Sequence, residues 1–312
     1  MHNSKVMAYF NIILVNILWG TSFIASKYAL VNGFSPLMLA LMRFVIITII
    51  MFPLVLKKEK RISFPKESFV LILASGLMGV TMYYVLAYNA LELTSASNTA
   101  LIFAAVPIFS MLYNAVFKKK KFSLFCWFGV VMSLFGVYLL VFYGGNAEID
   151  FSNKDALIGN LLMIGACLAW VAYIEFTNSI SKKYCALYVT WWQFIFGTIA
   201  LVPFALFEGS TISNISFMSW GSILYLALVC SGFGYLVHLS SINKLGPVIA
   251  ALSVNILPIS ATIGSVLLLG ETVTLLQGIG GVIVLASIVA VTLGMNKKQQ
   301  PIHTDTIFKL ED

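Results

Sequence analysis

An internal repeat constrains this chain more than any other feature: residues 1–143 and 156–295 carry one pattern, displaced by 151 positions. Both copies consist of nearly continuous hydrophobic segments. Aligned without a gap, they place identical residues together at Trp19 and Trp170, Tyr84 and Tyr235, Ala100 and Ala251, Pro107 and Pro258, and Gly129 and Gly280. A duplicated membrane unit is the plan of many secondary transporters, in which the substrate site lies between the halves.

The composition excludes a water-soluble protein of this size. Hydrophobic residues make up 60% of the 312 residues, charged residues make up only 10%, and the mean hydropathy is +0.96. A soluble domain of this length needs far more charge on its surface. The net charge of +7 does not indicate nucleic-acid binding, because the basic residues form short clusters between apolar runs.

Apolar runs of about 20 residues, long enough to cross a bilayer, predict ten membrane-spanning helices. We expect residues 144–155 to form a linker on the outer side and residues 296–312 to form a disordered cytoplasmic tail. The predicted spans are 6–30, 36–56, 68–91, 94–117, 122–143, 156–179, 186–207, 216–242, 247–269 and 273–295.

The distribution of basic residues predicts the orientation. With the N-terminus in the cytoplasm, 16 of the 19 basic residues fall on the cytoplasmic side, and only Lys27, Arg43 and Lys154 do not. Such a bias favours a multi-pass membrane protein with both termini in the cytoplasm. Five spans in each repeat is an odd number, so the second copy crosses the membrane in the opposite sense. The sequence therefore predicts an all-α fold of two inverted five-helix repeats.

Several motifs, taken in chain order, resemble those of EamA-type carriers in the drug/metabolite transporter superfamily. They lie at residues 16–23, 41–44, 87–97, 104–107, 269–272 and 277–280. The similarity extends over about residues 8–295. The resemblance implies a bacterial inner-membrane carrier, often an exporter of amino acids or other small metabolites, without identifying the cargo.

Three ionisable residues inside predicted spans are candidates for function, because a charge at the centre of a membrane helix costs roughly 2.5–3.5 kcal/mol on insertion scales. Arg43 can bind a carboxylate or a counter-ion in a cavity. The alternatives are an interhelical hydrogen-bonding post or an arginine that snorkels to the outer interface. Glu175 and His238 are candidates for proton coupling. The alternative for both is a neutral, hydrogen-bonded side chain.

Aromatic and amide side chains at helical spacing form a second set of candidates. They predict a cavity suited to a flat or partly apolar solute. Interfacial aromatic belts and polar contacts between helices are the alternative interpretation. With Arg43, the candidate substrate-binding residues are Asn16, Trp19, Tyr84, Tyr88, Asn98, Trp170, Tyr173 and Asn255.

Pro107 and Pro258 occupy matching positions and predict kinks, because proline removes a backbone hydrogen bond. Glu271 is expected to stabilise the first turn of the last helix.

The sequence contains no P-loop, no zinc-protease motif and no linear arrangement typical of nucleophilic catalysis. We therefore expect no cofactor, no metal and no ATPase subunit, and a partner set of one small-molecule solute and the lipid bilayer. The predicted function is export of a small metabolite or amino acid by alternating access. Uptake, efflux of toxic compounds, and an intramembrane enzyme or lipid-handling protein are the alternatives.

Overall fold

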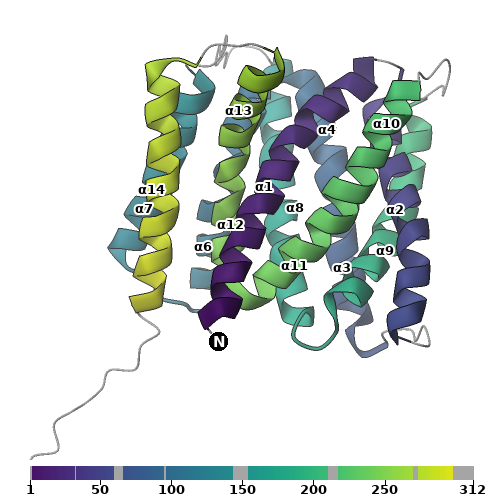
Figure 1. Ribbon diagram of the computed structural model, residues 1–312, viewed down its shortest axis with the longest axis horizontal. Helices are drawn as coiled ribbons and strands as arrows, with labels where there is room; N and C mark the ends of the chain where they lie inside the picture. The colour runs from purple at the N-terminus through teal and green to yellow at the C-terminus, as the bar shows by residue number, and fades with distance from the viewer. Residues whose placement is uncertain are drawn as a thin grey trace, which may run out of the picture.

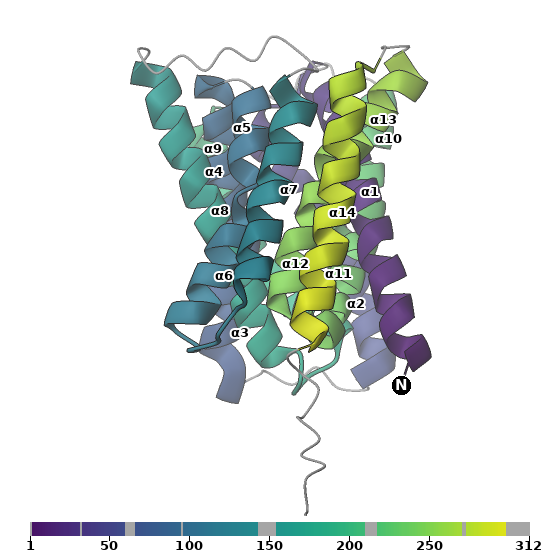
Figure 2. The same cartoon turned by 90° about the vertical axis from the view of Figure 1, so that its left-hand side faces the viewer.

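The computed structural model describes residues 2–31, 33–59, 66–94, 96–142, 154–209, 217–269 and 273–297, and these residues form helices and short turns without any strand. The helices stand roughly side by side in one bundle (Figures 1 and 2). Within the described residues, nine of the predicted spans are long and apolar enough to cross a membrane. The first predicted span corresponds to α1, which is 30 residues long.

The first repeat contains five spans, two of which are divided. Its helices are α1 (His2–Val31), α2 (Pro36–Glu59), a third span built from η1 (Lys66–Ser68), α3 (Phe69–Gly76), η2 (Leu77–Met82) and α4 (Tyr83–Leu93), a fourth built from α5 (Ala96–Phe103) and α6 (Val106–Val116), and α7 (Leu124–Phe142).

The second repeat has the same plan. Its helices are α8 (Lys154–Ile180), α9 (Ala186–Phe207), a third span built from α10 (Phe217–Tyr225), η3 (Leu226–Phe233) and α11 (Gly234–Leu245), a fourth built from α12 (Pro247–Ser253), η4 (Val254–Ile256) and α13 (Leu257–Leu269), and α14 (Leu275–Lys297). α8 begins two residues before its predicted start, and Asp155 in its first turn suits the positive end of the helix dipole.

The two repeats run in opposite directions, as the odd number of spans predicts. α1 rises from the end of the bundle that holds the N-terminus, whereas α8 descends toward that end (Figure 2). The predicted fold class, an all-α membrane protein with two inverted repeats, is therefore confirmed.

Both prolines at matching positions lie at breaks in their spans. A two-residue turn separates α5 from α6 just before Pro107, and the 3-10 turn η4 separates α12 from α13 just before Pro258. Because proline has no N–H to donate, the preceding turn cannot complete its helical hydrogen bonds. The predicted distortion occurs in both repeats.

The third span of each repeat contains a π-helical segment that the hydrophobic pattern did not reveal. η2 covers Leu77–Met82 and η3 covers Leu226–Phe233. Shifted by 151 positions, η2 coincides with residues 228–233 of η3. A π segment widens the helix, weakens its regular hydrogen bonding and is frequent at functional sites.

Close packing of α7 against α14 depends on two glycines. A Cβ added at Gly280 would lie 2.6 Å from the backbone oxygen of Gly136, and one added at Gly278 would meet nothing within 4 Å. We expect Gly280→Ala to lower the free energy of unfolding by about 1–3 kcal/mol, because the helices must separate. Gly278→Ala, in the same helix, is the control and should be neutral or slightly stabilising. Equal unfolding curves for the two variants in detergent micelles would show that this contact is not tight.

Candidate functional site

The two repeat-related tryptophans meet in the buried core of the bundle. Trp19 on α1 and Trp170 on α8 have ring centroids 5.5 Å apart at an interplanar angle of 77°. This edge-to-face arrangement is favourable for aromatic rings. Four more rings surround the pair, and we call the six together the central aromatic cluster. Its members are Trp19, Tyr83, Trp170, Tyr173, Tyr235 and His238.

The cluster draws its residues from both repeats, and all of them are buried except Tyr83, which is half-buried. His238 on α11 lies 5.0 Å from Trp19 and 5.7 Å from Trp170, measured between ring centroids. Tyr173 lies 5.0 Å from Trp170, and Tyr235 lies 5.7 Å from Tyr173. The structure thus brings together four of the predicted site residues, namely Trp19, Trp170, Tyr173 and His238.

The π segments supply backbone acceptors to this cluster. Trp19 Nε1 donates to the carbonyl of Cys230 at 2.8 Å, and the Tyr235 hydroxyl donates to the carbonyl of Gly79 at 3.0 Å. Gly79 and Cys230 are themselves 151 positions apart, so the two acceptors are repeat-equivalent. Irregular hydrogen bonding in a π segment leaves such carbonyls available to side chains.

Some polar atoms of the cluster have no protein partner. Within the described part of the chain, Trp170 Nε1 and both ring nitrogens of His238 make no hydrogen bond. A buried donor or acceptor without a partner is costly, so these atoms need a ligand, a water molecule or another conformation. Trp170 differs in this from Trp19, its repeat equivalent.

Arg43 lies beside the cluster on α2 and is only 3% exposed. Its Nε donates to Ser231 Oγ at 2.9 Å, and its guanidinium carbon lies 5.1 Å from the ring centre of Tyr84 and 5.3 Å from that of Phe44. Tyr84 also contacts Tyr88, with centroids 5.5 Å apart. Three further predicted site residues, Arg43, Tyr84 and Tyr88, therefore form one group.

Two of the three predicted asparagines lie elsewhere, and the third is not among the described side chains. Asn16 Nδ2 donates to Ser253 Oγ at 3.0 Å and joins α1 to α12. Asn255 Nδ2 donates to Ser133 Oγ at 2.9 Å and joins η4 to α7, away from the cluster. The side chain of Asn98, in α5, lies outside the described residues. Asn16 and Asn255 thus make interhelical contacts, which was the alternative interpretation for polar residues in spans.

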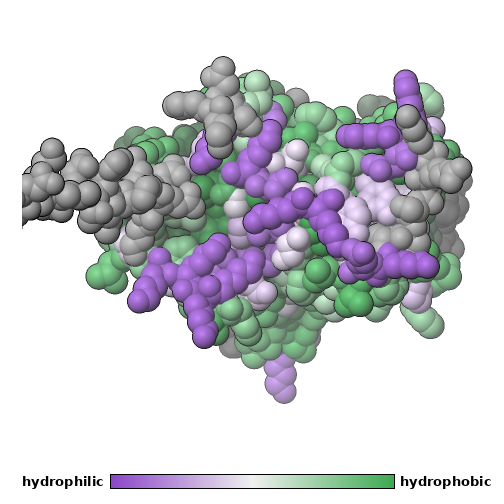
Figure 3. Space-filling view, turned by 90° about the horizontal axis from the view of Figure 1, so that it is seen from below, coloured by the Kyte–Doolittle hydropathy of each residue, from purple (hydrophilic) through white to green (hydrophobic). Residues whose placement is uncertain are grey.

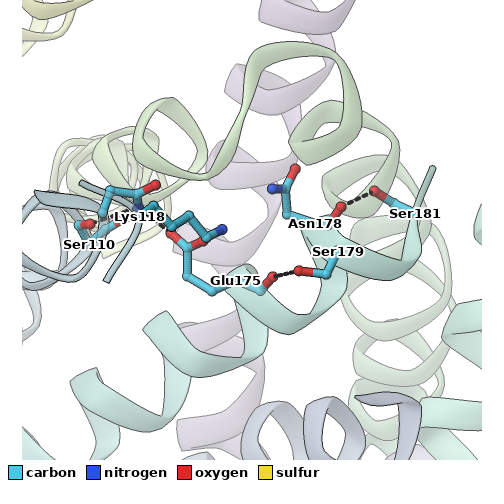
Figure 4. A network of polar contacts seen from close by, with 7 residues as sticks. Ser110, Lys118, Glu175, Asn178, Ser179 and Ser181 are labelled. Carbon is cyan, nitrogen blue, oxygen red and sulfur yellow. Dashed lines mark hydrogen bonds and ion pairs between the residues drawn. The ribbon is translucent and has the colours of Figure 1, made fainter. Parts of the chain in front are cut away.

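Glu175 is also separate from the cluster, near the last turn of α8. It is 1% exposed, its Oε2 lies 2.5 Å from Lys118 Nζ, and Asn114 Nδ2 donates to its other oxygen. Figure 4 shows the Glu175 side chain directed toward Lys118. The contact joins α8, in the second repeat, to the residues after α6, in the first.

Lysines gather at the end of the bundle where the N-terminus lies. We call this the lysine end, and hydrophilic residues cross the middle of its surface in Figure 3. A second ion pair between the repeats lies there, with Lys183 Nζ 2.5 Å from Glu67 Oε2; its hydrogen bond raises the pKa of Lys183. The described lysines of this end are Lys5, Lys57, Lys58, Lys66, Lys118, Lys119, Lys120, Lys121, Lys182, Lys183 and Lys244.

A cleft of about 420 Å³ lies toward the opposite end, between helices of the two repeats. The carboxylate of Glu208 at its rim accepts hydrogen bonds from the backbone N–H of Leu37 and Met38 at the start of α2. The cleft is lined by Leu37, Val85, Leu86, Asn89, Glu92, Leu162, Phe204, Phe207 and Glu208.

Sequence reasoning missed several residues of this region. Tyr235 could have been found, because it aligns with Tyr84 in the repeat. The charge pattern identifies Lys118 only as a cytoplasmic basic residue, although it follows Asn114 by one helical turn. Glu271 lies outside the described residues; at the start of α14, Thr274 and Gln277 form a reciprocal capping box with contacts of 2.8 and 3.2 Å.

Comparison with known proteins identifies relatives along almost the whole chain. The model of the EamA-like transporter family matches residues 6–142 and 157–293. A protein of Archaeoglobus fulgidus named as an uncharacterized transporter is 27% identical over 89% of this chain and 95% of its own length. The uncharacterized transporter YdfC of Bacillus subtilis is 29% identical over 90% of this chain and 89% of its own length.

A solved crystal structure has a similar fold. It superposes with a TM-score of 0.74 over 92% of this chain and 98% of its own, at 17% sequence identity. At that identity the likeness concerns the fold alone.

Proposed function

This chain belongs to the EamA-like transporter family, which it matches over both repeats, and we propose that it exports a small metabolite or amino acid across the inner (plasma) membrane. The protein is a multi-pass membrane transporter of the drug/metabolite transporter type. The proposed mechanism is alternating access, in which the central aromatic cluster is reached first from one end of the bundle and then from the other.

Unequal hydrogen bonding of the two repeat-related tryptophans is the observation that carries this proposal. Trp19 donates to the carbonyl of Cys230, whereas Trp170 has no described partner. In an inverted-repeat carrier, exchanging the conformations of the two halves converts one facing state into the other. In the exchanged state Trp170 would donate to the carbonyl of Gly79, and Trp19 would release that of Cys230.

The structure is consistent with a state that is closed at the lysine end. Two ion pairs join the repeats there, Lys118 with Glu175 and Lys183 with Glu67, whereas the described cleft lies toward the other end. The positive-inside rule supports a cytoplasmic lysine end, and therefore cytoplasmic termini. On that orientation this is the outward-facing state.

The driving force is proposed to be the proton gradient or the gradient of the solute itself. Of the two proton-coupling candidates, His238 contacts both tryptophans and has two ring nitrogens without a described partner. Glu175 is engaged by Lys118 and Asn114. His238 is therefore the better placed of the two to exchange a proton with the cargo site.

Transport in proteoliposomes tests the proposal. Vesicles are loaded with a pool of amino acids and small metabolites, a pH gradient is imposed or omitted, and mass spectrometry identifies what leaves. Selective loss of one solute class, abolished by Trp19→Ala and retained by Trp220→Ala, is the expected result. Selective accumulation from outside would indicate uptake, and no selective movement in either direction would contradict a transport role.

A pair of conservative substitutions should shift the conformational equilibrium in opposite directions. Trp19→Phe removes a hydrogen bond made in this state, and Trp170→Phe removes one expected only in the exchanged state. Such a hydrogen bond contributes about 0.5–1.5 kcal/mol. Each substitution should therefore change the ratio of the two facing states roughly 2- to 10-fold. Distance distributions between spin labels on α6 and α8 at the lysine end measure this. If both substitutions shifted the ratio of the two facing states in the same direction, the proposed exchange of conformations between the repeats would be contradicted.

A further inference from the structure

The interior of the protein holds one positive charge that nothing described balances. Arg43 and Glu175 are the two charged side chains that are buried among the described residues. Glu175 forms an ion pair with Lys118, whereas no described carboxylate forms one with Arg43. An unpaired charge inside a membrane protein is costly and marks a functional site by default. A mobile anion is the simplest source of the missing charge.

The hydrogen-bonding groups of Arg43 are only partly used. A guanidinium carries five N–H donors. Nε donates to Ser231 Oγ at 2.9 Å, and the Tyr88 hydroxyl is a second hydrogen-bonding partner of Arg43, so most of the five donors have no described partner. The rings of Tyr84 and Phe44 lie about the guanidinium, with centroids 5.1 and 5.3 Å from its central carbon, and restrict its position. The terminal nitrogens form a planar fork, which matches a carboxylate bidentately.

Arg43 lies deeper in the bundle than the cleft-lining Leu37 and adjoins the cluster through Phe44. Leu37, which lines the cleft, precedes Arg43 on α2 by six residues, or roughly 9 Å along the helix. Tyr84 adjoins Val85 of the cleft wall on α4. Phe44 contacts Tyr235 of the cluster at a centroid distance of 6.0 Å. A ligand on Arg43 therefore has apolar and aromatic surfaces beside it.

We propose that Arg43 binds the carboxylate of the cargo, so that the transported class is small monocarboxylic acids with an apolar or aromatic body. The inference rests on the proposed transport function for its physiological meaning, but binding can be measured without transport. The carboxylate supplies the missing counter-charge, and the body of the acid packs against the central aromatic cluster. No described carboxylate lies in that cluster to receive an ammonium group, so the acid group is the required feature.

The charges at the two ends suit an anionic cargo moving outward. The lysines concentrate anions at the lysine end, while Glu92 and Glu208 line the cleft at the other end and favour release. A cationic cargo would be repelled at the lysine end and held by the carboxylates at the other end.

Isothermal titration of the purified protein in detergent tests the inference with matched acids and amides. The probes are phenylacetate against phenylacetamide and 4-methylpentanoate against its amide. We expect the wild-type protein to bind an acid at least 10-fold more tightly than its amide. Arg43→Gln should lose roughly 10- to 100-fold in affinity for the acid, as expected for a charged hydrogen bond, with no loss for the amide. Lys154→Gln removes one exposed positive charge and should bind as the wild type does.

The outcomes separate this inference from the proposed function. Binding of acids in preference to amides supports the site, whether or not the same acids move in proteoliposomes; absence of movement would then count against transport alone. Equal affinity for acid and amide, or no binding of either acid, overturns the carboxylate site even if another solute is transported. If Arg43→Gln does not fold, the comparison of acid with amide on the wild-type protein still decides between these results.

Discussion

Lys118→Ala is expected to lower the free energy of unfolding by about 3 kcal/mol. The substitution leaves the buried carboxylate of Glu175 with Asn114 as its remaining partner. Breaking a buried ion pair by removing one partner costs about 3–5 kcal/mol, and the low end applies because Lys118 is itself 29% exposed. Equilibrium unfolding in mixed detergent micelles measures the change.

Two controls distinguish the pair from a general effect of charge at the lysine end. Lys121→Ala removes an exposed lysine nearby and should change the stability by less than about 0.5 kcal/mol. Replacing both Lys118 and Glu175 by Met removes the two charges together and should recover much of the loss. Equal effects of Lys118→Ala and Lys121→Ala would mean that the ion pair contributes nothing to stability.

Trp170→Ala is expected to lower the free energy of unfolding by about 3–5 kcal/mol, which is the range for removing aromatic residues from cores. Trp170 is 3% exposed and packs against Trp19, Tyr83 and Tyr173 from three different spans. Its removal opens a cavity between the repeats and should also abolish transport. Unfolding in micelles and the proteoliposome assay measure the two effects separately.

Trp220 supplies the matched control for this substitution. It is 38% exposed on α10 and has an edge contact with Phe34, with centroids 6.1 Å apart. Trp220→Ala should lower the free energy of unfolding by about 1 kcal/mol and leave transport unchanged. If both tryptophan substitutions reduced transport to the same extent, the central aromatic cluster would have no special role.

Much of the fold follows from the sequence because a membrane permits few solutions. Inside a bilayer the backbone must satisfy its own hydrogen bonds, so long apolar runs become helices. The repeat, the odd number of spans and the prolines then determine the inverted arrangement and the breaks before Pro107 and Pro258. The repeat also aligns Trp19 with Trp170 and makes both candidates for a site between the halves, but their direct contact is seen only in the structure.

Polar contacts between repeats could not be predicted in the same way. Asn255 reaches Ser133, 122 positions earlier, and Glu175 reaches Lys118, 57 positions earlier, and no periodicity encodes either distance. The π segments also escape hydrophobic patterns, because a single widened turn leaves the composition of the span unchanged. Arg43 is conspicuous in the sequence, but only the structure shows Ser231 and Tyr84 around it.

Reversible cross-linking of the lysine end tests alternating access most directly. Cysteines replace Lys118 and Glu175, Ser replaces the partly exposed Cys185, and a short bis-methanethiosulfonate joins the two thiols in proteoliposomes. Solute export should stop when the link forms and return when dithiothreitol removes it, because the lysine end must open in each cycle. Export that continues at the same rate with the link fully formed would contradict alternating access between the repeats.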